Sequence, residues 1–534
     1  MTSTGCTNNN KSKLGIALLI KPEDLPLTFS PRLTVRTLDF SAQENLCVIN
    51  EETAKKIGAT LESRLMIRLD NLKAYYFGVI ISGKGFVNKD EIGIPRDIAH
   101  ALGLKDGDNV NATPVNVSES IEIIRNKLKG KRLSREEISK LIRDVVNGAL
   151  DEAGIAAFLS AQEAVGMDDE ELYYLTLEMA TQGTVLSHPY PVYDEHSIGG
   201  VPGNSKVALV AVPTAIAFGI KIPKTSSRAI VSPSGTADTM EVLARVDLTA
   251  DEIKEALVKV GGTLAWTGRL NLSPADDIFV RTERKLRIDP ESQMIASILS
   301  KKVAMGVSGL VIDIPTGEGA KVSTINEAER LASRFLMVTN KLKISSKVLI
   351  TFGGEPIGFT VGPALEAREA LETLMKKSGP PSLVHKALSI VAALLELSGK
   401  ANYGEGLNLA RSMFESGKPE LIFRKMIEFQ GGNPEVKPED ISLAEFSYTV
   451  KASFSGAVTK INNNAVNIIA RAAGAPFDKK AGVMLHAKIG YRVNQGDPLL
   501  TIYSSSANNL NKARELAESL AVFEIGHMVL KSIP

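Results

Sequence analysis

The sequence predicts a multidomain α/β protein whose parts are a β-rich barrel, a helical domain, an α/β domain with a mostly parallel sheet, and a C-terminal α+β domain. A chain of 534 residues is too long for one hydrophobic core, and its length suggests roughly three or four domains. With 44% hydrophobic and 23% charged residues, the composition is that of an ordinary globular protein. The spacing of the apolar residues changes along the chain, and these changes set the expected boundaries.

Residues 1–116 are expected to form a β-rich barrel of the double-psi-like kind. Short runs rich in β-branched and aromatic residues lie along this part: LGIALLI, ENLCVIN, RLMIRL and AYYFGVII. A helical segment, DIAHALGL, and a turn, KDGDNV, follow them.

Residues 117–187 are expected to form a helical domain, joined by part of 280–310. Its segments carry apolar residues at helical spacing, with Ser or Asp near the start and Gly near the end: SIEIIRNKLKG, SREEISKLIRDVVNGAL, DEAGIAAFLSAQEAVG and DDEELYYLTLEMATQG.

Residues 188–437 are expected to form the α/β domain, and residues 438–534 the C-terminal one. In the first, compact apolar runs (VALVAVPTAIAFG, GLVIDI, KVLITFGG) alternate with helical text, which predicts buried and largely parallel strands. In the second, FSGAVTKI, GVMLHAKIGYRV and DPLLTIYS indicate barrel-like strands around one helix, with NNLNKARELAESLAVFEIG as a closing helix and strand.

The composition also narrows the partners and the compartment. A net charge of +1 without a Lys/Arg-rich block argues against nucleic acid as a partner. Cys6 and Cys47 make neither a disulfide framework nor a zinc site, so we expect no metal and a reducing cytoplasm. The start lacks an export signal and LGIALLI is too short to cross a bilayer, so we expect no membrane association.

The stretch DEHSIGGVPGN, from Asp194 to Asn204, has the chemistry of a phosphate cradle. Its three glycines let the backbone take φ > 0 and approach a bound group, while Ser197 and free N–H groups can donate to an anion. The adjacent acids Asp194 and Glu195 do not fit that role. An ordinary glycine-rich turn is the alternative.

A second segment, KTSSRAIVSPSGTADTMEV, also suits an oxyanion. Arg228 supplies a planar fork of donors, and Gly235 allows a tight turn before a helix expected to begin at Ala237. The hydroxyl groups come from Ser226, Ser227, Ser232, Ser234 and Thr236. The alternative is a serine-rich loop that Thr236 caps.

Two further segments carry charged groups. In RKLRIDPESQMIASILSKK, Asp289 precedes a helix start and could be its N-cap, while Ser297 and Lys301 share one helical face. Lys301 and Lys302 could equally be a solvated helix end. In VIDIPTGEGAKVST, a glycine-rich turn and Lys321 follow an apolar strand, where α/β folds place ligand contacts.

Together these motifs resemble the thymidine/pyrimidine-nucleoside phosphorylase family, most closely its archaeal branch that acts on nucleoside 5′-monophosphates. The resemblance runs from about residue 118 to the C-terminus and rests on HSIGGVPGN, SSRAIVSPSGTAD, ASILSKK, GEGAK, AGAPFDKKAG and GDPLLTIY. It implies a pentosyltransferase that converts AMP and phosphate to adenine and ribose 1,5-bisphosphate, with CMP and UMP as further substrates. The resemblance implies no cofactor, because phosphate is a co-substrate. It also implies a homodimer or a larger homo-oligomer.

The resemblance also implies roles for single residues. Asp289 would donate a proton to the leaving base. AMP and phosphate would be bound by Gly200, Ser227, Arg228, Ala229, Ile230, Val231, Ser232, Thr236, Ser297 and Lys321. Ser197 and Ser226 are further candidates for the phosphate, Lys301 for the base, and His196 for either of the two. Asp289 can donate only if its pKa is raised, as burial and a neighbouring anion would do, whereas an N-cap role would lower the pKa.

Glu195 departs from the family pattern, in which the residue before the histidine is typically a lysine that helps bind phosphate. At ~4 Å a carboxylate would repel phosphate by on the order of 4 kcal/mol at an effective dielectric constant near 20. Either the affinity for phosphate falls, or the Glu195 side chain turns away from the phosphate. In the second case we expect Lys206 to pair with Glu195 and to supply the positive charge that the missing lysine would have given.

Two alternatives to the nucleotide phosphorylase remain open. One is a thymidine or pyrimidine nucleoside phosphorylase that needs no 5′-phosphate. Arg228 argues against it, because this residue offers a partner for that extra phosphate. The other is a non-catalytic nucleotide-binding homologue, and the presence of Asp289 and Lys321 argues against it.

Overall fold

The computed structural model describes residues 32–42, 45–61, 63–68, 74–83, 85–115, 119–229 and 232–526, with Arg269 described by its backbone only. The chain divides into two compact units, Met1–Ser118 with Asn147–Ala149, and Glu119–Val146 with Leu150–Pro534. The expected strand LGIALLI and Cys6 lie outside the described residues.

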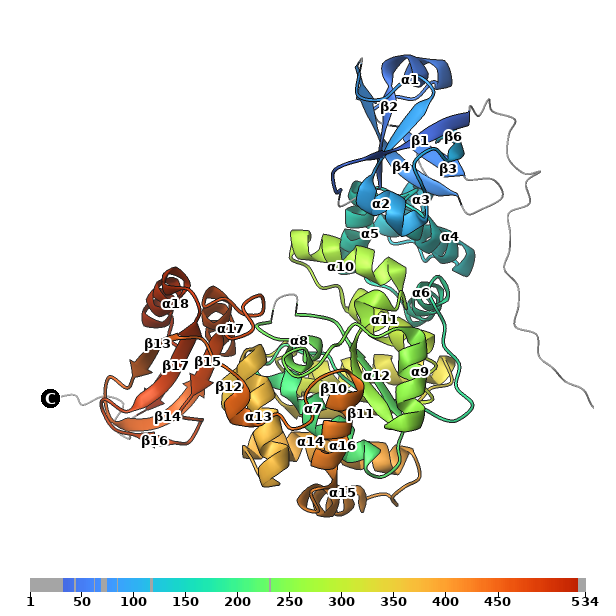
Figure 1. The fold of residues 1–534 in the computed structure, drawn as a ribbon. Helices are drawn as coiled ribbons and strands as arrows, with labels where there is room; N and C mark the ends of the chain where they lie inside the picture. The colour runs from blue at the N-terminus through green and yellow to red at the C-terminus, as the bar shows by residue number, and fades with distance from the viewer. Residues whose placement is uncertain are drawn as a thin grey trace, which may run out of the picture. The chain divides into compact units, whose positions relative to one another are not determined.

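The first unit contains a closed six-stranded barrel, in blue in Figure 1, with the strand order β1-β5-β2-β4-β3-β6. Its strands are β1 (Arg32–Leu38), β2 (Leu46–Asn50), β3 (Arg64–Arg68), β4 (Tyr75–Ser82), β5 (Glu91–Pro95) and β6 (Asn109–Val115), and its helices α1 (Glu51–Ile57) and α2 (Arg96–Leu102). Val35, Phe77 and Ile92 are buried in its core. Cys47 is a free thiol there, and burial raises its pKa to about 12. The predicted N-terminal barrel is confirmed.

The second unit begins with a helical bundle. Its helices are α3 (Ser120–Leu128), α4 (Arg135–Val146), α5 (Glu152–Val165) and α6 (Asp169–Thr181), and α10 (Pro274–Leu286) and α11 (Glu291–Ala304) pack against them. Capping side chains fix the starts: Asp151 accepts from Gly154 N at α5, and Asp168 forms a capping box with Glu171 at α6. Each such cap stabilises a helix by about 1 kcal/mol.

The α/β part is built on parallel strands, as the sequence predicts. A three-stranded sheet has the order β11-β10-β7, with β7 (Tyr193–Ser197), β10 (Gly309–Thr316) and β11 (Ser345–Phe352). A parallel pair joins β8 (Ile222–Ser226) to β9 (Gly262–Trp266). All eight residues of the central strand β10 are buried, which explains its continuous apolar text.

Helices surround these strands (Figure 1). They are α7 (Val207–Ile216), α8 (Thr236–Met240), α9 (Ala250–Lys259), α12 (Ile325–Lys341), α13 (Pro363–Lys376), α14 (Pro381–Leu397), α15 (Gly406–Glu415) and α16 (Lys418–Phe429), with 3₁₀ turns η2 (Asn204–Lys206), η3 (Thr267–Arg269) and η4 (Pro438–Asp440). Among the described residues no single helix is long and apolar enough to cross a membrane; α13 and α14 reach that length only as a pair bent by 74°.

One predicted element is wrong. The apolar content of VALVAVPTAIAFG places it among the expected strands, but it forms helix α7, whose ten residues are all buried. A helix covered on every side has no polar face, so its sequence lacks the 3.6-residue period that distinguishes a helix from a buried strand.

The C-terminal part is α+β, in orange and red in Figure 1. One antiparallel sheet has the order β12-β15-β17-β13, from β12 (Thr360–Val361), β13 (Phe446–Lys451), β15 (Gly482–Leu485) and β17 (Pro498–Ser504); the other has the order β16-β14-β18, from β14 (Gly456–Ile461), β16 (Arg492–Val493) and β18 (Phe523–Gly526). Helices α17 (Asn463–Ala472) and α18 (Ala507–Ser519) pack against each other. Strand β12 comes from the α/β part of the chain, so this sheet takes its edge from residues before 438.

Candidate active site

The glycine-rich loop starts where β7 ends, at Ser197. Gly199 N donates to Ser197 Oγ over 3.2 Å, and Gly199 and Gly200 have φ values of +78° and +89°. A Cβ at Gly200 would lie 2.8 Å from Cβ of Lys321, so only glycine fits there without a shift. The structure therefore places Gly200 directly against the turn that follows β10.

The same loop contacts the start of α8. Thr236 Oγ1 donates to Ser205 O over 3.3 Å, and Ser205 Oγ lies 2.7 Å from Thr239 Oγ1. Helix α8 begins at Thr236, one residue before the expected start, and has only five residues. Two of the segments that the sequence predicts to bind anions thus lie side by side.

The loop between β8 and α8 contains two short hydrogen bonds between its own serines and neighbouring carbonyl groups. Ser226 Oγ donates to Ser227 O and Ser232 Oγ to Ser234 O. The Arg228 guanidinium pairs with Glu241 at 2.5 Å and lies 4.7 Å from the ring centre of Trp266. Ile230 and Val231 lie outside the described residues.

Asp289 lies just before α11 and pairs with Lys321. Pro290 is the N-cap of α11 and no side chain caps this helix, so the capping alternative for Asp289 is wrong. Its side chain is 48% exposed and that of Lys321 34%, so Asp289 does not have the burial that the proton-donor role was expected to need. Lys321 nonetheless joins Gly200 and Asp289 in one site.

Glu283 on α10 is a site residue that the sequence reasoning missed. Burial and the neighbouring carboxylates of Asp276 and Asp289 raise its pKa to about 8, against the opposing charges of Lys321 and Lys301. The side chain is therefore mostly protonated at neutral pH. Glu283 follows the buried Asp276 and Phe279 at i+7 and i+4, and that helical spacing is the signal that could have placed it on the inner face of α10.

Lys302 is buried, Lys301 is mostly buried, and both are paired, so the solvated helix end is wrong. Lys301 Nζ lies 2.6 Å from Asp276 Oδ2, and Lys302 Nζ lies 2.6 Å from Asp194 Oδ2. Burial opposes the charge on Lys301, but the nearby Asp276 carboxylate raises its pKa overall. Ser297, one turn earlier on α11, is half-buried.

Glu195 does not face the phosphate cradle. It is 4% exposed, and its carboxylate lies 2.8 Å from Lys224 Nζ of β8. Burial opposes the charge on Lys224, but Glu195 and Asp194 raise its pKa overall. The lysine that neutralises Glu195 therefore lies 29 residues further along the chain, next to the loop between β8 and α8.

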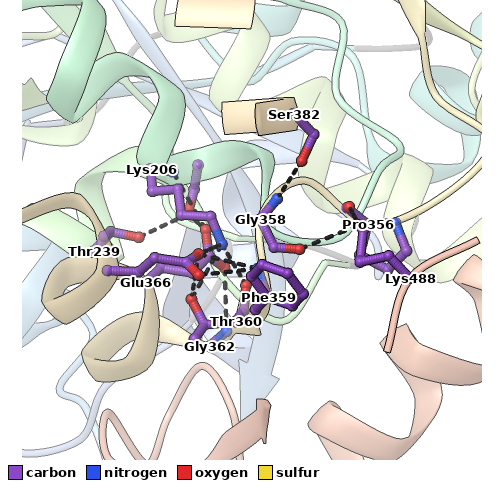
Figure 2. A network of polar contacts seen from close by, with 12 residues as sticks. Lys206, Thr239, Pro356, Gly358, Phe359, Thr360, Gly362, Glu366, Ser382 and Lys488 are labelled. Carbon is purple, nitrogen blue, oxygen red and sulfur yellow. Dashed lines mark hydrogen bonds and ion pairs between the residues drawn. The ribbon is translucent and has the colours of Figure 1, made fainter. Parts of the chain in front are cut away.

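Lys206 has another role, so the expected Lys206–Glu195 pair is wrong. Its ammonium group donates to Thr360 O over 2.5 Å and pairs with Glu369 at 2.6 Å; Lys206 and Thr360 are drawn in Figure 2. Glu366 in the same network accepts from Ser205 Oγ over 2.5 Å. These contacts fix the end of the glycine-rich loop to β12 and α13.

His196 is a residue of β7 whose pKa is strongly lowered. Burial lowers its pKa well below the ordinary value, and Lys302, Lys224, Lys301 and Lys321 lower it further. Its Nδ1 atom is buried without a hydrogen-bond partner among the described residues. The ring is therefore neutral at physiological pH and can donate or accept one hydrogen bond.

Taken as a whole, the site suits an anion and a polar ring. Backbone N–H groups, hydroxyl groups and Lys321 can hold phosphate, and the carboxyl groups of Asp289 and Glu283 can take part in proton transfer. The described residues contain no group of three His, Cys, Asp or Glu side chains placed to hold a metal ion.

Three known families match separate parts of the chain. They are described as the glycosyl transferase family, helical bundle domain (residues 121–183), the glycosyl transferase family, a/b domain (residues 189–420), and the pyrimidine nucleoside phosphorylase C-terminal domain (residues 457–523). Among curated proteins, AMP phosphorylase of Hyperthermus butylicus is 53% identical over 81% of this chain and 86% of its own length. The chain belongs to the AMP phosphorylase family.

Other members of the AMP phosphorylase family match nearly the whole chain. The AMP phosphorylase of Pyrococcus furiosus is 45% identical over 93% of this chain and 99% of its own length, and that of Methanocaldococcus jannaschii is 43% identical over 94% and 99%. Matches of this length must include much of the barrel. Anthranilate phosphoribosyltransferase from Thermus thermophilus is a similar solved structure, 19% identical over 57% of this chain and 98% of its own, with a TM-score of 0.49.

Proposed function

We propose that this chain catalyses phosphorolysis of AMP, giving adenine and ribose 1,5-bisphosphate. The observation that carries the proposal is the junction at Lys321, whose backbone lies against Gly200 and whose ammonium group pairs with Asp289. It joins a phosphate-type loop to a carboxyl group in a chain whose relatives are AMP phosphorylases. Orienting an anion beside a sugar and protonating the base are the two main needs of this reaction.

The substrate contacts are part of the proposal. Phosphate binds at Ser197, Gly200, Ser226 and Thr236, and the nucleotide along residues 227–232 and at Ser297 and Lys321, with Lys301 and His196 toward the base. Arg228 binds the 5′-phosphate after its guanidinium leaves Glu241; the pair is 41% and 29% exposed, so exchanging one anion for another costs little. CMP and UMP are further substrates, and no cofactor takes part.

Two carboxyl groups stand near enough to share the proton-donor role. We assign donation to the leaving base to Asp289, which pairs with Lys321 in the site. Burial and the neighbouring charges of Asp276 and Asp289 raise the pKa of Glu283 to about 8, so Glu283 mostly carries a proton at neutral pH. Glu283 is therefore the internal proton source that Asp289, half-exposed and ion-paired, does not provide by burial.

The protein is further proposed to be a cytoplasmic homodimer or larger homo-oligomer. It acts on small molecules and not on nucleic acid. The fold and the charge balance are compatible with each of these, and the net charge of +1 supports the last.

The decisive experiment incubates the full chain with AMP in the presence and absence of phosphate and measures free adenine and ribose 1,5-bisphosphate. Adenine should form only with phosphate, and adenosine should be a far poorer substrate. Equal turnover of AMP and adenosine would favour the nucleoside phosphorylase instead. No turnover of any nucleotide or nucleoside would favour the non-catalytic homologue.

A further inference from the structure

The loop between β8 and α8 closes on one carboxylate. Asp238 Oδ2 accepts from Ala229 N over 2.7 Å and from Gly235 N over 3.1 Å, so a single side chain joins the two ends of the loop. A Cβ at Gly235 would lie 2.9 Å from Ser227 O, which shows how closely those ends approach. Asp238 is only 2% exposed, so its charge needs a partner.

That partner comes from the C-terminal part of the chain. Lys479 Nζ lies 2.7 Å from Asp238 Oδ1 and 3.0 Å from Glu241 Oε2. Lys479 belongs to the AGAPFDKKAG motif, which the proposed chemistry does not use. The motif is anchored independently of that ammonium group, since Ala364 N at the start of α13 donates to Lys479 O over 2.9 Å.

A second contact reaches the same loop from the same part of the chain. Arg471 of α17 donates through Nη1 to Ser232 O over 3.3 Å. The loop that carries most of the proposed nucleotide contacts is thus held from outside at Ser232 and, through Asp238, at Ala229 and Gly235.

We propose that Lys479 and Asp238 are positioning residues: Lys479 neutralises Asp238, and Asp238 holds the loop in the shape that binds the nucleotide. Lys479 also affects Glu241, because Glu241 forms ion pairs with both Lys479 and Arg228. When Arg228 turns to a substrate phosphate, Glu241 keeps Lys479 as a partner and is not left as an unpaired anion. The part that concerns AMP rests on the proposed function.

Loss of this support lowers the fraction of the loop in its binding shape. The apparent dissociation constant of a ligand rises in inverse proportion to that fraction, whereas the reaction of the bound substrate is little changed. A residue with only a structural role would lower the melting temperature without this separation of KM from kcat.

The test compares Lys479→Ala with Lys480→Ala, its exposed neighbour, whose side chain makes no ion pair with the described residues. Lys479→Ala should raise the KM for AMP about tenfold with kcat changed less than about twofold. It should also speed hydrogen exchange at the amides of Ala229 and Gly235. Lys479→Arg should restore both properties, and Lys480→Ala should leave both unchanged.

Hydrogen exchange separates this proposal from the proposed function because it needs no turnover. Faster exchange in Lys479→Ala with no AMP turnover in the wild type would keep the positioning role and reject the function. Unchanged exchange and unchanged KM, or equal effects in Lys480→Ala, would reject the positioning role. If Lys479→Ala does not fold, Lys479→Gln, which keeps most of the side chain, is measured in its place.

Discussion

Three lysines near the site form two kinds of ion pair. Lys224 and Lys302 are 5% and 1% exposed and pair with Glu195 and Asp194 of β7, whereas Lys321 is 34% exposed and pairs with Asp289. A buried pair is costly to break because the remaining charge is left without a partner, but an exposed pair contributes little and exchanges partners easily. The buried pairs therefore build the scaffold, and the exposed pair is available to substrates.

The largest effect is expected at the exposed pair, and on activity. Asp289→Asn should lower kcat by roughly 10²–10⁴-fold, the usual contribution of acid–base catalysis, because the amide cannot donate the proton of a carboxyl group. The free energy of unfolding should change by less than about 1 kcal/mol, as for other exposed pairs. Steady-state kinetics and urea denaturation of the same preparation check both numbers, and near-wild-type turnover would remove Asp289 from the mechanism.

Next comes the buried pair at Lys302. Lys302→Met removes the nearer of the two lysines that pair with the buried Asp194 and leaves only Lys224 Nζ, at 3.8 Å, so it should lower the free energy of unfolding by up to about 3–5 kcal/mol. The matched control is Lys302→Met with Asp194→Asn, which removes both charges and should recover much of the loss. Equal losses in the single and double variants would show that packing, and not charge, is what Lys302 provides.

A third change tests the position of Glu195. Glu195→Lys introduces the residue that the family resemblance leads us to expect at this position, but it places a second ammonium group beside Lys224 in a buried strand. It should lower the free energy of unfolding by about 3 kcal/mol or more and should not lower the KM for phosphate. A phosphate KM reduced tenfold in a fully stable variant would mean that the side chain at 195 does reach the cradle.

The last effect concerns pH, and it is spread over several pH units. The pKa of Glu283 is raised from 4.5 to about 8 in the folded chain, so the folded state keeps a proton that the unfolded state releases in this range. The stability associated with it is present below pH 4.5 and is lost as the pH rises through about 8. In Glu283→Gln this slope should disappear, which melting temperatures at about pH 5 to 9 would show. An unchanged slope would place the titrating group elsewhere.

The sequence predicted the elements that have a regular spacing of apolar residues or a capping side chain. It also predicted the loops that are rich in glycine and hydroxyl residues. The strands β10 and β11, the capped helices of the bundle and the glycine-rich loop all have such local signals. Helix α7 has none, since every residue in it is buried. The ion-pair partner of Glu195 could not be predicted from the sequence either. Lys224 approaches Glu195 because β8 packs near β7, and no spacing along the chain indicates this.

Strand β12 has a practical consequence for cutting this protein into pieces. It pairs with β15 through Thr360–Met484 and Val361–Val483, and Leu485 N adds a bond of 2.7 Å to Phe359 O. A fragment that starts at residue 438 would lack this strand. Its β15 would then be an edge strand with unpaired backbone N–H and C=O groups, which favours self-association. Supplied with the fragment that ends at 437, the same edge becomes the docking point that would let the two halves reassemble as a split protein.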